Sequence, residues 1–194
     1  MASLDTNTLR MNIGRLAKIK NAALELAESK LQSEKNEFLN EFENHPVTEE
    51  IKAGPNSKNI SMTLGGYGNL FSFIGFENNF DPTSPVSFLI RKIRLIKTSL
   101  SKKSKNGSVV SFRVLVPSLE DFRKNSPMPW AAGRSWLEGV ERGISGFGYY
   151  ISRALSGRSG GGVQANNQIR SGAFKNTSYF TRMYKNFINR INSQ

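Results

Sequence analysis

The chain has 194 residues, a formal net charge of +12 at pH 7 and no cysteine. This length suits one domain with decorations or two small ones, and a chain of this size buries enough apolar surface to fold without disulfides or a structural metal. The lack of cysteine excludes a disulfide scaffold, a thiolate metal site and a cysteine nucleophile.

A long helix is predicted over residues 8–43. Apolar residues recur there at helical spacings and form one stripe. The stripe comprises Leu9, Ile13, Leu16, Ala23, Leu24, Ala27, Leu31, Phe38, Leu39 and Phe42. Pro46 prevents the helix from continuing. At 1.5 Å per residue the helix would be about 50 Å long, and helices of that length usually lie across a sheet or reach a neighbouring molecule.

Two strands and a turn are predicted next. Ile60, Met62 and Leu64 alternate with polar residues, and a glycine-rich turn follows at 65–69. Residues 70–76 (LFSFIGF) resemble a strand that is apolar on both faces. Together these runs predict a β-hairpin.

A second helix and a third strand are predicted in the middle of the chain. Residues 81–85 (DPTSP) resemble a helix entrance. The helical stripe that follows comprises Val86, Leu89, Ile90, Ile93 and Ile96. Residues 109–116 alternate as in a strand, which Pro117 ends. The final element is a short helix after Thr177 and Ser178, with an apolar face that includes Phe180 and Phe187.

These elements predict the α+β class. We expect a long N-terminal helix packed on a small, mostly antiparallel sheet, with a further helix and a C-terminal helix. Residues 1–194 are expected to form a single domain, in which 1–50 contain the long helix. Residues 155–178 are predicted to be a Gly-rich flexible loop or extension. The Gly-rich stretch 126–162 does not indicate one type of element.

Residues suited to catalysis are few, and we expect no enzyme, no cofactor and no metal. His45 is the only histidine, and at a helix end it is more typical of a C-terminal cap partner than of a catalyst. Glu138 and Glu141 could share a helix face, but a solvated or interface pair is the favoured interpretation over an acid/base dyad. The glycine clusters lack the Gly-Lys-Ser/Thr ending of a nucleotide-binding loop. No apolar run is long enough to cross a membrane, and no signal peptide is evident.

The charge is distributed unevenly. Residues 1–50 hold nine acids and six bases, whereas 51–194 hold six acids and 21 bases. Eight bases and no acid lie between Arg91 and Arg113. Such a cluster can bind phosphates or an acidic protein face, and the alternative is a solvated face. The candidate interaction residues, toward DNA or a protein partner, are Lys102, Lys103, Lys105, Arg134, Arg158 and Arg170.

The order of elements resembles the neck or tail-completion proteins of tailed bacteriophages, the head-tail connector family. After the long leading helix, the segments that carry the resemblance are 44–48 (NHPVT), 68–76 (GNLFSFIGF), 127–130 (PMPW), 133–136 (GRSW), 141–143 (ERG) and 158–164 (RSGGGVQ). The resemblance spans most of the chain, from the leading helix to residue 164, but none of these segments is a chemical fingerprint.

The resemblance implies a non-enzymatic virion protein, assembled in the host cytoplasm, that forms a homo-oligomeric ring between portal or adaptor and tail. Its loops and ends would contact the portal, adaptor, tail tube or terminator, and basic residues could touch packaged DNA. An acidic N-terminal segment meeting a basic body in the next copy would suit such a ring. The alternative is a basic nucleic-acid-binding protein, such as a ribosome-associated one, which the net charge and the Arg91–Arg113 cluster favour.

Overall fold

The structure, a computed structural model, describes residues 6–65, 68–96, 102–104, 107–109, 112–142 and 177–192. Within these ranges, the side chains of 6–17, 19, 102–104 and 107–109 are not described.

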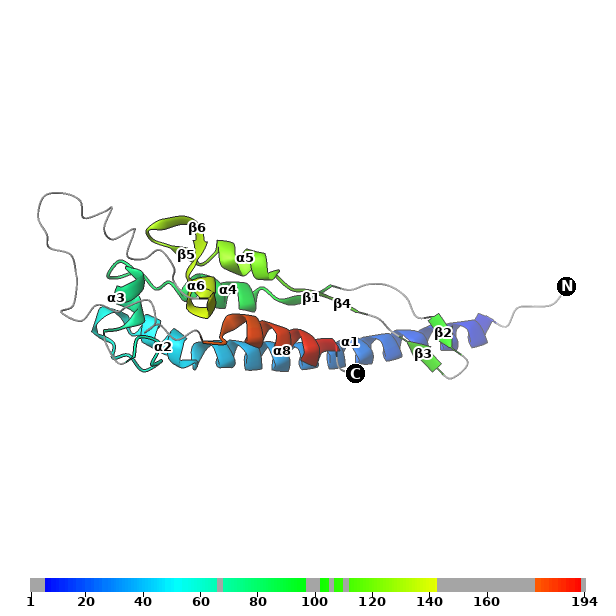
Figure 1. Cartoon of the computed structure of the whole chain (residues 1–194). Helices are drawn as coiled ribbons and strands as arrows, with labels where there is room; N and C mark the ends of the chain where they lie inside the picture. Colours follow the sequence, from blue (N-terminus) through cyan, green and yellow to red (C-terminus); the bar gives the residue numbers. More distant parts are fainter. Residues whose placement is uncertain are drawn as a thin grey trace, which may run out of the picture.

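Helix α1 (Thr6–Glu43) has 38 residues and is the longest element of the described chain (Figure 1). The sequence prediction of a helix over 8–43 is therefore confirmed, and the helix ends just before Pro46, as expected from the lost N–H of proline. Its C-terminal half buries Leu31, Phe38 and Phe42 in the core. Among the side chains of α1 that are described, those buried in the core lie from Leu31 onward.

The C-terminal helix α8 (Phe180–Asn192) lies along α1 and runs in the opposite direction (Figure 1). Tyr179, just before α8, packs on Phe42 near the end of α1, whereas Phe187 stacks on Phe38 with ring centroids 4.9 Å apart. The predicted apolar face of this helix is confirmed, because Phe180, Met183 and Phe187 are all buried.

Helix α2 (Pro46–Lys52) follows α1 after a short break, and its N-cap is His45. The Nδ1 atom of His45 accepts a hydrogen bond from the backbone N–H of Val47 at 3.2 Å. The prediction that His45 caps the C-terminus of the first helix is wrong. His45 caps the next helix instead, because Pro46 starts that helix immediately and leaves the N–H of Val47 without a partner in the helix.

The hairpin predicted over 60–76 is wrong. Residues 54–56 form a 3-10 helix, η1 (Gly54–Asn56), residues 60–65 form turns, and Leu70–Ile74 is helix α3. Asn69 caps α3 by accepting from the N–H of Ser72, and Gly75, at φ 83°, ends it in the left-handed conformation. A short apolar run fits a strand or a helix equally well, and here the caps select the helix.

Helix α4 (Ser84–Arg91) is shorter than the predicted stripe, which continued to Ile96. The chain leaves the helix at Lys92 and enters strand β1 (Arg94–Ile96), which pairs antiparallel with β4 (Arg113–Leu115). The predicted strand over 109–116 is confirmed in its C-terminal part by β4. Ile93 is buried just after α4, whereas Ile96 is exposed on β1. The apolar residues of the predicted stripe are therefore divided between α4 and β1.

A second antiparallel pair joins β2 (Lys102–Ser104) to β3 (Gly107–Val109). The strand pairs β1–β4 and β2–β3, here called the strand arm, extend in the same direction as the N-terminal half of α1 (Figure 1). Strand β1 contacts α1. The described chain is therefore elongated, with the strand arm and the N-terminal half of α1 reaching away from the core.

The remaining elements close the core at the other end. They are α5 (Leu119–Lys124), β5 (Pro127–Met128), β6 (Ala131–Ser135) and α6 (Trp136–Arg142). A capping box between Ser118 and Asp121 starts α5, and β5 pairs antiparallel with β6. The α+β class with small antiparallel strands is confirmed, although the strands form separate two-stranded sheets and α1 packs on α8 and α4 as well as on β1.

Candidate assembly surface

The structure places the candidate basic residues on different parts of the chain. Lys102 and Lys103 are on strand β2 of the strand arm. Arg134 is exposed on β6, at the opposite end of the molecule (Figure 1). Lys105, Arg158 and Arg170 lie outside the described residues, as does the predicted flexible segment 155–178 except for its last two residues. The described candidates therefore do not form one site.

Residues 18–43 are the part of α1 whose side chains are described, apart from that of Ile19, and the first half of this part (18–30, here called the uncovered half) has little cover. None of the described side chains from Lys18 to Lys30 is buried. Leu26 is 74% exposed, and Ala23, Leu24 and Ala27 of the predicted apolar stripe are only half-buried. An isolated helix gains most of its stability from packing of an apolar face, so this half of α1 is suited to contact another molecule.

The outward face of the strand arm combines bases with apolar side chains. Arg94 is paired with Leu115, and Ile96 with Arg113. All four side chains are exposed, Ile96 by 37% and Leu115 by 45%, whereas Leu95 on the opposite face packs against the core. Such a face can bind an apolar surface that carries some negative charge.

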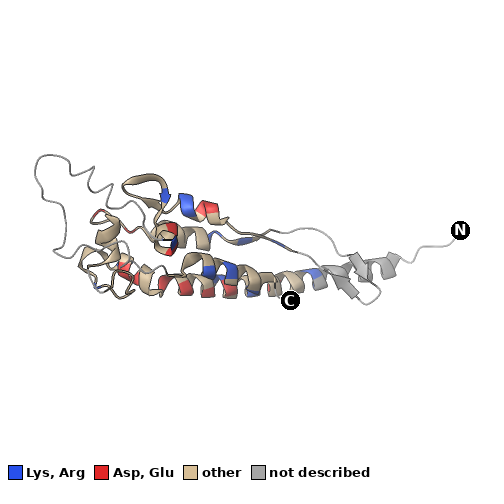
Figure 2. Ribbon diagram, in the orientation of Figure 1, with Lys and Arg blue, Asp and Glu red and all other residues tan. Residues whose placement is uncertain are grey.

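The acidic residues in the C-terminal half of α1 are paired within the same chain. Arg190 of α8 contacts Glu34 at 2.7 Å, Glu41 at 2.8 Å and Glu37 at 3.3 Å. Burial acts to lower the pKa of Arg190, but the hydrogen bond and charge of Glu41, together with its two neighbours, raise it overall. In Figure 2, blue Lys and Arg positions of α8 lie beside red Asp and Glu positions of α1.

Arg91 of α4 contacts Glu43 at the end of α1, with 3.2 Å between the guanidinium and carboxylate atoms. The hypothesis that acids of the first helix meet bases of a neighbouring copy therefore needs acids other than these four. The side chains of Glu25 and Glu28, in the uncovered half of α1, are exposed.

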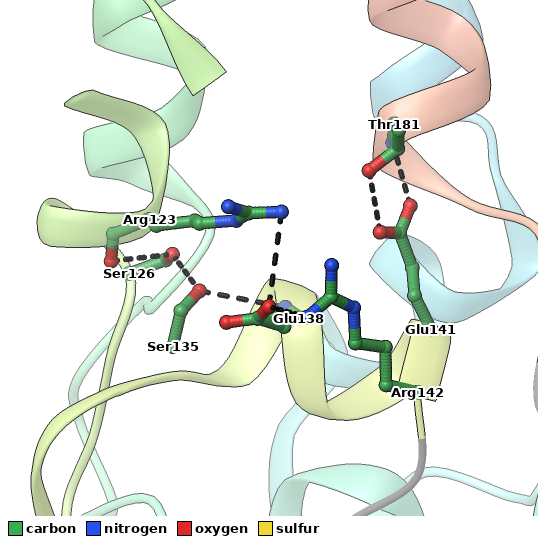
Figure 3. A network of polar contacts seen from close by, with 7 residues as sticks. All are labelled: Arg123, Ser126, Ser135, Glu138, Glu141, Arg142 and Thr181. Atoms are coloured by element: carbon green, nitrogen blue, oxygen red, sulfur yellow. Dashed lines mark hydrogen bonds and ion pairs between the residues drawn. The ribbon is translucent and has the colours of Figure 1, made fainter. Parts of the chain in front are cut away.

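Glu138 and Glu141, weighed above as an acid/base pair, have separate structural partners (Figure 3). Glu138 lies 2.6 Å from Arg142 and 3.7 Å from Arg123. Glu141 accepts hydrogen bonds from the backbone N–H and hydroxyl of Thr181 at the start of α8. Glu138 thus links α6 to α5, and Glu141 links α6 to the start of α8.

Within the ranges that the structure describes, no group of three His, Cys, Asp or Glu side chains is placed to hold a metal ion. In that part of the chain no helix is long and apolar enough to cross a membrane.

One feature was missed by sequence reasoning. A groove with a volume of about 830 Å³ lies between α1 and α8 and is lined largely by amide and other polar side chains. The only sequence signal was the spacing of Asn36, Asn40 and Asn44, which places these three on one helix face.

No family model, no curated protein and no solved structure matches this chain.

Proposed function

We propose that this chain is a non-enzymatic structural subunit of a bacteriophage neck, a head-tail connector or tail-completion protein that forms a ring between portal or adaptor and tail. The observation that supports this most strongly is the uncovered half of α1, residues 18–30. The described side chains of α1 are buried only from Leu31 onward, so residues 18–30 are available for contact with another subunit.

The strand arm supports the same proposal. It adds a second elongated surface, with Ile96 and Leu115 exposed on its outward face. Two different elongated surfaces on one subunit suit head-to-tail contacts, and such heterologous contacts produce rings when the rotation closes. Portal, adaptor, tail tube or terminator proteins would then bind the two rims of the ring, in a virion assembled in the host cytoplasm.

The oligomeric state of the purified protein tests this function. Light scattering at low and high salt, followed by electron microscopy, is expected to give a discrete mass and ring-shaped particles. Added DNA is expected to leave that mass unchanged. A protein that stays monomeric at all concentrations, alone and with portal or adaptor rings, would contradict the proposal.

A second candidate function, nucleic-acid binding, is favoured by the strand arm. Arg94 and Arg113 are exposed on its outward face, and the chain between Asp81 and Glu120 contains no acid. Binding through phosphates would weaken steeply between about 50 and about 200 mM salt. If this function is correct, the double variant Arg94→Ala/Arg113→Ala will bind DNA or RNA more weakly and with a smaller salt slope, whereas Arg134→Ala will not.

A further inference from the structure

A short loop between α3 and α4 exposes an aromatic side chain between two acids. Residues 77–81 are here called the Phe80 loop. The N–H of Phe80 donates to the carbonyl of Glu77 at 3.2 Å and closes a turn, in which Asn79 has the left-handed conformation at φ 74°. Asparagine adopts this conformation more readily than most residues. The turn leaves Phe80 53% exposed, and the side chains of Glu77 and Asp81 are exposed beside it.

The two carboxylates of this loop have no basic partner in their own chain. Over the residues that the structure describes, neither Glu77 nor Asp81 has an ion pair. Asp81 accepts hydrogen bonds from the backbone N–H and the hydroxyl of Thr83 at 2.9 and 2.6 Å, which fix the carboxylate in place without neutralising its charge. The Phe80 loop therefore presents an apolar ring together with two uncompensated negative charges.

The outward face of the strand arm has the opposite charge. Its exposed side chains are those of Arg94, Ile96, Arg113 and Leu115, and in the described part of the chain neither arginine has an ion pair. Paired residues of two strands lie about 5 Å apart, so each arginine has an aliphatic side chain directly beside it. A guanidinium pairs with a carboxylate and also stacks on an aromatic ring. The face is therefore complementary to the Phe80 loop in both charge and apolar character.

The two surfaces lie apart within one copy. Helix α4, which has 8 residues, stands between the Phe80 loop and β1, and a helix of that length spans about 12 Å. In Figure 1, α3, after which the loop follows, lies toward one end of the molecule, and the strand arm reaches toward the other. Each copy thus carries a loop and a complementary face that are both open to neighbouring copies.

We propose that the Phe80 loop of one copy docks on the outward face of the strand arm of a second copy. Phe80 packs against the aliphatic side chains of Ile96 and Leu115, and the two carboxylates of the loop face the two arginines. Because each copy has one loop and one arm face, the contact repeats head to tail and forms a ring when the rotation closes. This inference rests on the proposed function, since a ring needs contacts between copies, and it assigns one of those contacts to defined residues.

The apolar and the charged groups have different roles in this contact. Exposed ion pairs add little to affinity, whereas an aromatic side chain buried in an interface often adds much. The charges instead select which surfaces meet, because two arm faces with unpaired arginines repel each other. We therefore expect the contact to persist at high salt.

Cysteine cross-linking tests where the copies meet. Because the chain has no cysteine, the variant Asn78→Cys/Leu115→Cys gives each copy one thiol at the loop and one at the arm face. A short bismaleimide is expected to join the assembled protein into a ladder of covalent dimers, trimers and longer chains on a denaturing gel. The matched control, Asn78→Cys/Asn189→Cys, has its second thiol at an exposed position of α8 and should give no ladder. A missing ladder in the first variant, or equal ladders in both, would overturn the inference.

Removal of the aromatic ring tests the apolar contact. Phe80→Ser is expected to raise the dissociation constant between copies about tenfold, as measured by analytical ultracentrifugation. The control is Phe88→Ser, since Phe88 is 57% exposed but lies on α4, outside both surfaces. Urea unfolding shows whether both variants are folded. Association of Phe80→Ser with the affinity of the wild type would overturn the inference.

A charge exchange tests the orientation of the loop. Glu77→Lys is expected to weaken association about two- to fivefold, because the new ammonium faces an arginine. A second change in the same chain, Arg94→Glu or Arg113→Glu, restores the wild-type affinity when it provides the facing carboxylate. A purely structural role of Glu77 would not allow this rescue, so failure of both double variants would overturn the proposed contact.

The light-scattering mass of the same samples separates the two proposals. A ring whose double-cysteine variant gives no ladder overturns this inference and leaves the proposed function standing. A monomer under all conditions overturns both. If the arm face binds DNA and Phe80→Ser leaves the oligomer mass unchanged, nucleic acid is the occupant of that face and the inference is overturned as well.

Discussion

At the scale of single residues, the most constrained side chain is Glu50 of α2, which is completely buried. Its carboxylate accepts hydrogen bonds from the Asn59 side chain at 2.9 Å, from the Ser61 N–H at 2.8 Å and from the Leu70 N–H at 2.7 Å. Glu50 thereby holds the loop around Asn59 and Ser61 and the start of α3 against α2. Buried polar groups are tolerated only when they are satisfied in this way.

Replacing Glu50 by glutamine is expected to lower the free energy of unfolding by about 1–3 kcal/mol, because the new amide turns a donor toward N–H groups that need an acceptor. Urea unfolding measures the change. The matched control is Glu49→Gln, an exposed neighbour on the same helix, with an expected change within about 0.5 kcal/mol. Equal losses in the two variants would show that Glu50 does not hold the loop.

His45 makes stability depend on pH. Burial, and secondly the positive charge of Arg182, lower its pKa, while Glu49 acts in the opposite direction. The folded protein therefore favours neutral His45, whose Nδ1 caps α2, whereas the unfolded chain binds a proton near pH 6.5. Stability is expected to fall as the pH drops below about 6.5 and to level off below the folded pKa.

The variant His45→Asn tests this pH dependence. Asparagine is a good N-cap whose side chain does not titrate. Thermal unfolding followed from about pH 7.5 to about pH 5.5 should show a smaller decrease in the variant, since the chain has no other histidine. Identical pH profiles for the two proteins would rule out His45 as the cause.

At the scale of elements, the part of α1 with described side chains has two halves with different environments. The covered half, residues 31–43, packs against α8 and α4, whereas the uncovered half, residues 18–30, exposes Leu26. The two halves should respond differently to substitution, one in the stability of the fold and the other in association.

In the covered half, Phe38→Ala removes a ring that packs on Phe180, Tyr184 and Phe187. The expected loss is about 3–5 kcal/mol, as for other buried phenylalanines. Chemical denaturation provides the measurement. Phe88→Ala is the control, because Phe88 is 57% exposed, and its change should stay below about 1 kcal/mol.

In the uncovered half, Leu26→Gln is expected to leave the unfolding free energy within about 0.5 kcal/mol of wild type, because nothing in the described core covers Leu26. Association should weaken, seen as a lower mass in light scattering at equal concentration. Glu28→Gln, two residues away on the opposite face of α1, should leave the mass unchanged. A wild-type mass for Leu26→Gln would place the contact between copies elsewhere.

At the scale of the whole molecule, each copy carries a net charge of +12. Copies therefore repel one another, and the Arg190 and Arg91 pairs show that four acids of α1 already serve their own chain. Contacts between copies must then come mainly from apolar and hydrogen-bonding surfaces.

Raising the salt concentration from about 0.1 M to about 1 M shortens the screening length from about 10 Å to about 3 Å. We expect the oligomeric fraction to rise or stay constant, because screening weakens the repulsion between copies. Analytical ultracentrifugation across the series measures this. Dissociation at high salt would instead indicate that charge pairs hold the copies together.

The sequence by itself determined the elements whose hydrophobic pattern repeats over several turns of neighbouring residues. The stripe of α1 and the apolar face of α8 each repeat over several turns, so their period indicates a helix without knowledge of any partner. Pro46 marked the end of α1, and the alternation over 109–116 indicated the strand that contains β4, because these effects act within a few residues.

Tertiary contacts were needed to decide the short segments and those shared between elements. Residues 70–74 have local caps in Asn69 and Gly75, and the helix is fixed in place by Glu50, twenty residues earlier, which accepts a hydrogen bond from the N–H of Leu70. Residues 94–96 leave the helical stripe because β4 offers them hydrogen bonds. The groove shows the same limit. Its polar lining residues on α1 and on α8 are visible separately in the sequence. They face each other only because α8 folds back onto α1, and no local pattern encodes this contact between distant segments.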